Sequence, residues 1–234
     1  MRTLPLLLAA LVAAPNAAPA QRDGPPAYFF AGGTLGVAEP AGELADHVET
    51  GYGITGHVLF RPYPEGFFGL RLDGGYVNYG RESRDVLLSS TVGGRISVDL
   101  NTTNDIVFLG IGPQIGVPGD RVQPYVNGMV GVAYFTTSSS LRGELDDESF
   151  ANTTNYDDAV LSYGGGAGLY VPLRTGRAPI SLDLGVRYHR NRDVSYLREG
   201  GITDNPDGSI TLHPIRSDTD LLTFHVGVSI GISR

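Results

Sequence analysis

Large apolar residues alternate with small or polar ones along residues 222–232. The apolar set comprises Leu222, Phe224, Val226, Val228, Ile230 and Ile232. Successive side chains of a strand point to opposite faces, so this spacing predicts a β-strand with one apolar face. A helix would instead need apolar residues three and four positions apart. The stretch also has the length of about ten residues with which a tilted strand crosses a bilayer.

The same alternation recurs in seven earlier segments, each of which is predicted to be a strand. They span residues 28–37, 52–61, 67–79, 105–117, 123–137, 160–171 and 180–190. The connections between the eight segments alternate long and short from the first to the last. In an antiparallel meander this places all long loops at one end and all tight turns at the other. The sequence therefore predicts an all-β fold, a closed antiparallel up-and-down eight-stranded transmembrane β-barrel.

One further stretch, residues 92–100, also alternates between apolar and polar residues. Counting it as a ninth strand would leave an odd number of strands and would move the acidic segment 138–158 to the short-turn end. We therefore interpret it as a β-extension within the long connection formed by residues 80–104.

The face opposite the large apolar residues combines many glycines with charged and polar side chains. Glycine at about half of these positions suits the crowded inside of a narrow barrel better than a solvent-facing exterior. Charges enclosed in this way should pair, because an unpaired buried charge is costly. The predicted interior polar network consists of His57, Arg61, Arg71, Asp73, Asp183, Arg187, His189 and His225. The alternative, a soluble lipocalin-like binder, would turn this face to water. A sharper interpretation of the network is a gated water or proton path.

Aromatic residues on the apolar face are sorted by their height along the strands. Phenylalanines lie toward the short turns and tyrosines toward the long loops, which is the pattern of the two aromatic girdles at membrane interfaces. The predicted girdle residues are Phe29, Phe60, Phe68, Tyr52, Tyr76, Tyr134, Tyr163 and Tyr188. A soluble core gives no reason for such sorting.

The N-terminus has the pattern of a secretory signal peptide. A basic Arg2 precedes an apolar run over residues 4–14 and then Ala18-Pro19-Ala20, so cleavage is expected after Ala20. We expect a signal peptide over residues 1–20, a periplasmic lead over 21–27 and the barrel domain over 28–234. The chain contains no cysteine, and its formal net charge of −8 comes without a basic patch, so no nucleic-acid partner is expected.

On these strands, turns and girdles the chain resembles the small eight-stranded outer-membrane barrels of the OmpA, OmpX and OmpW type. The resemblance implies outer-membrane localisation and, as partners, membrane lipid, lipopolysaccharide and the barrel-assembly machinery. It also implies a monomer. The chain departs from such barrels at its end, Ile232-Ser233-Arg234, which lacks their common terminal aromatic residue.

An eight-stranded barrel has an interior just wide enough to be filled by side chains. We therefore expect a structural or surface role with loop-mediated binding, and as the alternative a narrow OmpW-like channel for small or apolar molecules. The acidic segments 43–49 and 144–158 are hypothesised to bind divalent cations or lipopolysaccharide. Residues 204–208 are interpreted as a turn, since they lack the ligand spacing of a calcium loop. Lipid A enzymes of the outer membrane would need converging Ser, His and acid groups, and no such spacing stands out. No catalytic, cofactor-binding or metal-binding residue is expected.

Overall fold

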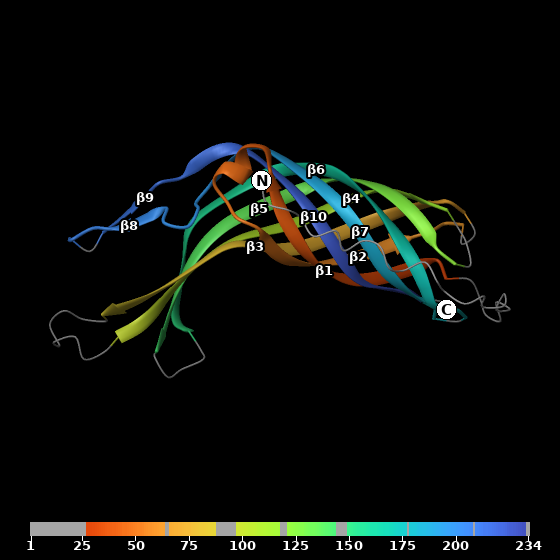
Figure 1. Ribbon diagram of the computed structural model, residues 1–234, viewed down its shortest axis with the longest axis horizontal. Coiled ribbons are helices and arrows are strands. Elements are labelled where there is room, and N and C mark those ends of the chain that lie inside the picture. The colour runs from red at the N-terminus through yellow and green to blue at the C-terminus, as the bar shows by residue number, and fades with distance from the viewer. Residues whose placement is uncertain are drawn as a thin grey trace, which may run out of the picture.

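The computed structural model describes residues 27–63, 66–87, 97–117, 121–143, 149–176, 178–207 and 209–232 (Figure 1). Eight antiparallel strands form a closed barrel in the order β1-β10-β7-β6-β5-β4-β3-β2. Their bounds are β1 (Phe29–Ala41), β2 (Gly51–Phe60), β3 (Phe68–Leu87), β4 (Ser97–Gly116), β5 (Gln123–Gly143), β6 (Ser149–Arg174), β7 (Ile180–Tyr196) and β10 (Ile215–Ile232). The predicted closed, antiparallel, eight-stranded barrel is confirmed.

The outer face of the barrel carries the large apolar side chains, as the alternation predicts. Leu35 on β1 is 65% exposed, and Val228, its near neighbour across the β1–β10 ladder, is exposed as well. The inner positions of the same strands are buried and polar, among them Thr34 and Ser229. This arrangement is the reverse of a soluble barrel, in which the apolar face fills the centre.

Six strands continue well beyond the predicted bounds, namely β3, β4, β5, β6, β7 and β10, and β3 to β6 form long hairpins at the long-connection end (Figure 1). The β3–β4 ladder runs to the pair Leu87↔Ser97, and the β5–β6 ladder runs to Arg142↔Ser149. Residues 97–104 thus begin β4, which agrees with a β-extension; residues 88–96 lie outside the described part. The expectation that residues 138–158 form a loop is wrong for the described residues. Their polar side chains do not prevent pairing, because the neighbouring strands satisfy the backbone hydrogen bonds.

The connection between β7 and β10 also contains structure that the sequence pattern did not indicate. A short hairpin of β8 (Ile202–Asp204) and β9 (Ile210–Leu212) projects beside the barrel (Figure 1). The connection between β1 and β2 contains the short 3-10 helix η1 (Gly42–Asp46). Among the described residues no helix is long and apolar enough to cross a membrane.

An apolar cluster fills the inside of the barrel near the long connections. Its aromatic centre consists of Tyr79, Phe135 and Tyr196, whose ring centroids lie 6.4 Å apart in each pair. Leu44 of η1 and Leu221 of β10 are buried in the same cluster. We call this cluster the apolar plug. It was not predicted, because the inner positions of the strands were expected to be glycine or polar along their whole length.

Several inward glycines sit where a side chain would strike the next strand. A Cβ at Gly227 on β10 would lie 2.1 Å from the carbonyl oxygen of Gly33, whereas a Cβ at Gly33, which faces outward, would meet no atom within 4 Å. We therefore expect Gly227→Ala to destabilise the barrel by roughly 1–3 kcal/mol through overpacking. Gly33→Ala is the matched control and should be close to neutral. Urea unfolding of the refolded barrels in detergent, followed by circular dichroism, compares them; equal midpoints would contradict this interpretation.

Candidate functional site in the barrel interior

A shared carboxylate joins two arginines across the inside of the barrel. Arg71 and Asp73 are two residues apart on the inner face of β3, and Arg187 comes from β7, with three strands between. One oxygen of Asp73, Oδ1, accepts a hydrogen bond from Nε of Arg71 at 2.8 Å and another from Nη2 of Arg187 at 2.9 Å. All three side chains are at most 4% exposed. The bridge therefore ties opposite walls of the barrel together.

Arg71 reaches two further strands through its Nη1 atom. This nitrogen donates to Oε1 of Gln114 on β4 and to the hydroxyl of Tyr170 on β6, both at 2.9 Å. A guanidinium offers five N–H donors in a fixed planar fork, so one arginine can hold several strands in register. Arg71 is the centre of the interior network.

A second carboxylate, Asp183 on β7, lies among aromatic and imidazole groups. Its Oδ1 accepts a hydrogen bond of 2.7 Å from the hydroxyl of Tyr125, and Nε2 of His225 lies 3.8 Å from the same oxygen. Nδ1 of His57 lies 4.0 Å from Oδ2. The Tyr125 ring stacks on Tyr170 with centroids 4.6 Å apart, so the two carboxylate clusters are in contact.

Six of the eight predicted interior residues are brought together in these two clusters: His57, Arg71, Asp73, Asp183, Arg187 and His225. The other two form no hydrogen bond or ion pair with these clusters among the described residues, although His189 lines one small cavity together with Arg187 and His225. The ring of His189 packs on Phe108 with centroids 4.8 Å apart, and the guanidinium of Arg61 lies 4.8 Å above the ring of Phe30.

Three members of the network were missed by the sequence reasoning, namely Gln114, Tyr125 and Tyr170. Their inward position was visible from the alternation. Nothing in the sequence indicated that they bond to charges from distant strands.

The residues predicted to form the aromatic girdles lie on the outer surface. Phe29 and Phe60 are in contact, with ring centroids 4.9 Å apart. Several tyrosines near the long connections bond to a neighbouring aspartate: the hydroxyl of Tyr76 donates to Asp105 at 2.5 Å, and that of Tyr188 donates to Asp220. Phe68, Tyr52 and Tyr134 are exposed as well, and Tyr163 is half-buried. The location of these rings at membrane interfaces stays a prediction.

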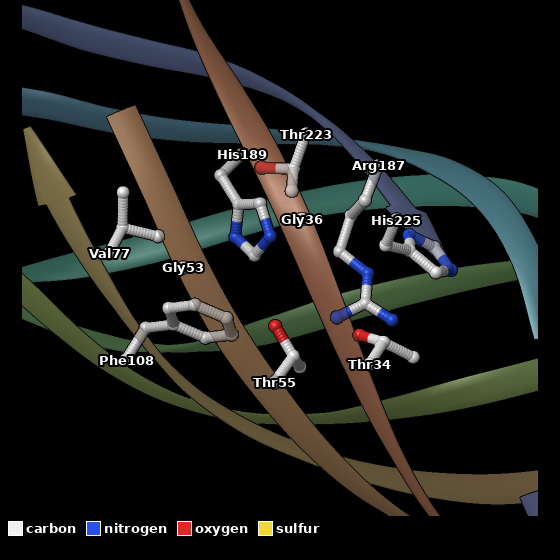
Figure 2. Close-up of a pocket in the computed structure, with 10 residues that line it drawn as sticks. All are labelled: Thr34, Gly36, Gly53, Thr55, Val77, Phe108, Arg187, His189, Thr223 and His225. Carbon is white, nitrogen blue, oxygen red and sulfur yellow. The ribbon is translucent and has the colours of Figure 1, made fainter. Parts of the chain in front are cut away.

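Two small enclosed cavities remain in the interior. Each has a volume of about 10 Å³, which is room for about one water molecule. The first is lined by residues of β1, β2, β3, β4, β7 and β10 (Figure 2). A larger hollow of about 700 Å³ lies on the outer, apolar face over Gly33, Gly56 and Gly74, which are paired in one row across β1, β2 and β3.

The described residues contain no group of three or more His, Asp or Glu side chains placed to hold a metal ion. Hydrogen bonds within the hairpin hold the turn at residues 204–207. Asp207 Oδ1 accepts hydrogen bonds from the hydroxyl and the backbone amide of Ser209, and Asn205 N donates to the Ser209 carbonyl. These are the contacts of the β8–β9 hairpin, as interpreted from the sequence; Gly208 lies outside the described residues.

An apolar exterior around a charged, enclosed centre is the architecture of a membrane barrel, and the sequence comparison agrees with it. The profile of the outer membrane protein beta-barrel domain family matches residues 4–230. The chain belongs to this family. The protein is thus an outer-membrane β-barrel, and the soluble lipocalin-like alternative is wrong.

Among solved structures this outer-membrane barrel is similar to neisserial surface protein A, with 11% identity, a TM-score of 0.47 and coverage of 87% of this chain and 97% of the other. It is also similar to OprG of Pseudomonas aeruginosa, with 15% identity, a TM-score of 0.40 and coverage of 90% and 99%. For Ail of Yersinia pestis the identity is 13%, the TM-score is 0.38 and the coverage is 86% and 95%. No curated protein sequence matches the chain.

Beyond the membrane, an acidic side chain joins the tip of β3 to the connection after β7. Glu82 accepts a hydrogen bond from Nε of Arg84 and one of 3.2 Å from the backbone amide of Gly200. The hydrogen bond from Arg84 holds the pKa of the Glu82 carboxyl below its ordinary value of 4.5, although partial burial opposes this shift. A lowered pKa means that the contact contributes stability above pH 4.5 and loses it as the pH falls through the folded-state pKa.

We therefore expect the protection factor of the Gly200 amide in hydrogen exchange to be constant from pH 7 to 5 and to fall once the pH drops below 4.5 and through the lowered pKa of Glu82. The Glu82→Gln variant removes the charge and should show the low protection at every pH. A wild-type protection factor that stays constant down to pH 3 would contradict a role of the Glu82 carboxylate.

Proposed function

We propose that this protein is a monomeric, non-enzymatic surface component of the outer membrane. In this proposal the closed interior has a structural role, and the long hairpins β3–β4, β5–β6 and β8–β9 make the contacts outside the cell. The observation that carries the proposal is the filling of the lumen. The Arg71–Asp73–Arg187 bridge spans the interior on one level, and the apolar plug fills it on another. A solute would have to displace both layers.

Reconstitution into planar bilayers tests this function. We expect the wild-type barrel to give no steady conductance, and liposomes that contain it should not swell in small sugars. Tyr79→Ala/Tyr196→Ala, which removes two rings of the plug but leaves the Arg71 network in place, should also stay closed, because one layer remains. Stable channels of the wild-type protein would overturn the proposal.

One observation favours the OmpW-like alternative, a path for small apolar molecules. Thr34 and Thr55 line both the outer hollow and the first interior cavity, so the wall between them is one strand layer thick. Gly56→Leu would fill the hollow from the lipid side. If uptake of an apolar solute by proteoliposomes depends on the wild-type protein and stops in this variant, the alternative replaces the leading proposal.

The partners proposed for the barrel are outer-membrane lipid, including lipopolysaccharide, and the barrel-assembly machinery. In this proposal the acidic segments 43–49 and 144–158 would meet phosphorylated headgroups through divalent cations. Glu43 in the first acidic segment accepts a hydrogen bond from the Asp218 amide, and residues 144–148 of the second lie outside the described part. If calcium changes neither the protease sensitivity of the hairpins nor the thermal stability, this cation-mediated contact is wrong.

We further propose export through a signal peptide cleaved after Ala20, which lies outside the described residues. The mass of the protein isolated from outer membranes decides this point. A mass that includes residues 1–20 would contradict it.

A further inference from the structure

The first interior cavity is small, and both polar and apolar side chains line it. It is about 10 Å³ in volume and lies between β1, β2, β7 and β10, with Phe108 and Val77 closing one side (Figure 2). Its polar lining consists of Thr34, Thr55, Thr223, Arg187, His189 and His225. Neither of the interior carboxylates, Asp73 and Asp183, lines it. A molecule bound in this cavity would therefore contact hydroxyls, imidazoles and a guanidinium, and no negatively charged side chain.

The cavity contains a charged group with bonding capacity left over. Arg187 is 4% exposed, yet within the described part of the chain its Nε has no hydrogen-bond partner. Its Nη2 atom donates to Asp73, and that carboxylate oxygen is shared with Arg71. A buried N–H of a charged group without a partner is costly, so a hydrogen-bond acceptor bound beside Nε of Arg187 would be stabilising.

The interior charges point to the sign of that acceptor. The bridge beside the cavity holds two arginines, Arg71 and Arg187, on one carboxylate, Asp73, so the bridge itself carries one excess positive charge. In an interior of low dielectric an uncompensated charge attracts a counter-ion more strongly than at the surface.

We propose that this cavity binds one small inorganic anion, chloride in ordinary media, between the Arg187 guanidinium and the hydroxyls of Thr55 and Thr223. The anion accepts from Nε of Arg187, which has no partner among the described residues, and offsets the excess positive charge of the bridge. The small volume admits a monatomic anion and excludes phosphate, sulfate and carboxylates. Bound chloride is then a structural component that holds β2, β7 and β10 together from inside.

The stability of the full-length mature barrel in detergent tests the proposal. Chloride is replaced stepwise by gluconate, which is too large for the cavity, at constant ionic strength and pH. We expect the temperature at which the heat-modifiable folded band disappears to fall by roughly 5–10 °C, the effect of losing a ligand present at about 100 times its dissociation constant. No shift between chloride and gluconate would overturn the proposal.

Two further measurements locate the effect. In crystals grown with bromide, an anomalous difference peak is expected beside Arg187 in wild-type protein; an ordered water without anomalous signal there would overturn the proposal. Thr55→Val/Thr223→Val removes two hydroxyls without changing shape and should abolish the chloride dependence, whereas Thr203→Val in the exposed β8–β9 hairpin should retain it. Equal chloride dependence in both variants would overturn this assignment. If the double variant does not fold, the wild-type bromide map decides alone.

Discussion

The variant Asp73→Ala is expected to lose about 3–5 kcal/mol of folding free energy, the cost of removing one partner from a buried ion pair. Here the loss affects two cations at once, because Asp73 Oδ1 accepts from both Arg71 and Arg187. Both guanidinium groups would remain buried, without their carboxylate and far from water. Urea titration of the refolded barrel in detergent, followed by far-UV circular dichroism, gives the loss as a shift of the midpoint.

Two variants separate this effect from a general loss of charge. Asp193 forms a bidentate pair with Arg216 on the exposed surface, so Arg216→Ala, which breaks the pair without changing the residue at the positive φ of Asp193, should change the midpoint little. The triple replacement Arg71→Met/Asp73→Leu/Arg187→Met removes charges of both signs and should recover much of the stability lost in Asp73→Ala. A similar midpoint for Asp73→Ala and Arg216→Ala would show that the bridge contributes nothing to stability.

The variant Val228→Arg is expected to destabilise the barrel by about 2–4 kcal/mol, because a cation would then face the acyl chains near the middle of the membrane. Val228 is exposed on β10, and its partners across the two ladders are Gly33 and Leu182. Neither of these two partners offers a carboxylate to an arginine, so its side chain must reach for the interface. Unfolding of the barrel in phospholipid vesicles by guanidinium measures the loss.

A second arginine substitution, placed nearer to the membrane interface, provides the control. Val122 is exposed in the short turn just before β5. Val122→Arg lies at the interface by this interpretation and should cost only about 0–1 kcal/mol. Equal effects of the two arginines, or no effect of either, would contradict the assignment of the apolar outer face to the membrane interior.

The fold could be predicted because every spanning strand must satisfy the same physical requirement. Each strand has lipid on one side and a crowded centre on the other, so the alternation at residues 222–232 repeats in seven other segments. The apolar plug, which fills the barrel near the long connections, could not be predicted in this way. Ile106 and Phe108 occupy the inward positions of the same alternation, yet they are large and apolar. The two-residue period shows which face a residue lies on, but it does not show that the inner face becomes apolar near a strand end.

The polar network could be predicted in its members but not in its contacts. Parity shows that Asp73 and Arg187 face inward, yet their hydrogen bond joins β3 and β7, which are not neighbours in the barrel. Such a contact depends on the diameter and stagger of the closed barrel, to which all eight strands contribute. Gln114 and Tyr170 were missed for the same reason, since their partner, Arg71, comes from elsewhere in the chain.

The seam between β1 and β10 pairs Phe29 with Ile232 at one end and Ala41 with Asp220 at the other. During biosynthesis one edge of β1 therefore stays unpaired until β10, the last strand of the chain, has been made and pairs with it. Any intermediate released earlier is an open sheet with one apolar face and two unpaired strand edges. We therefore expect premature truncation within β10 to leave the edge of β1 unpaired and to yield aggregates or degradation products.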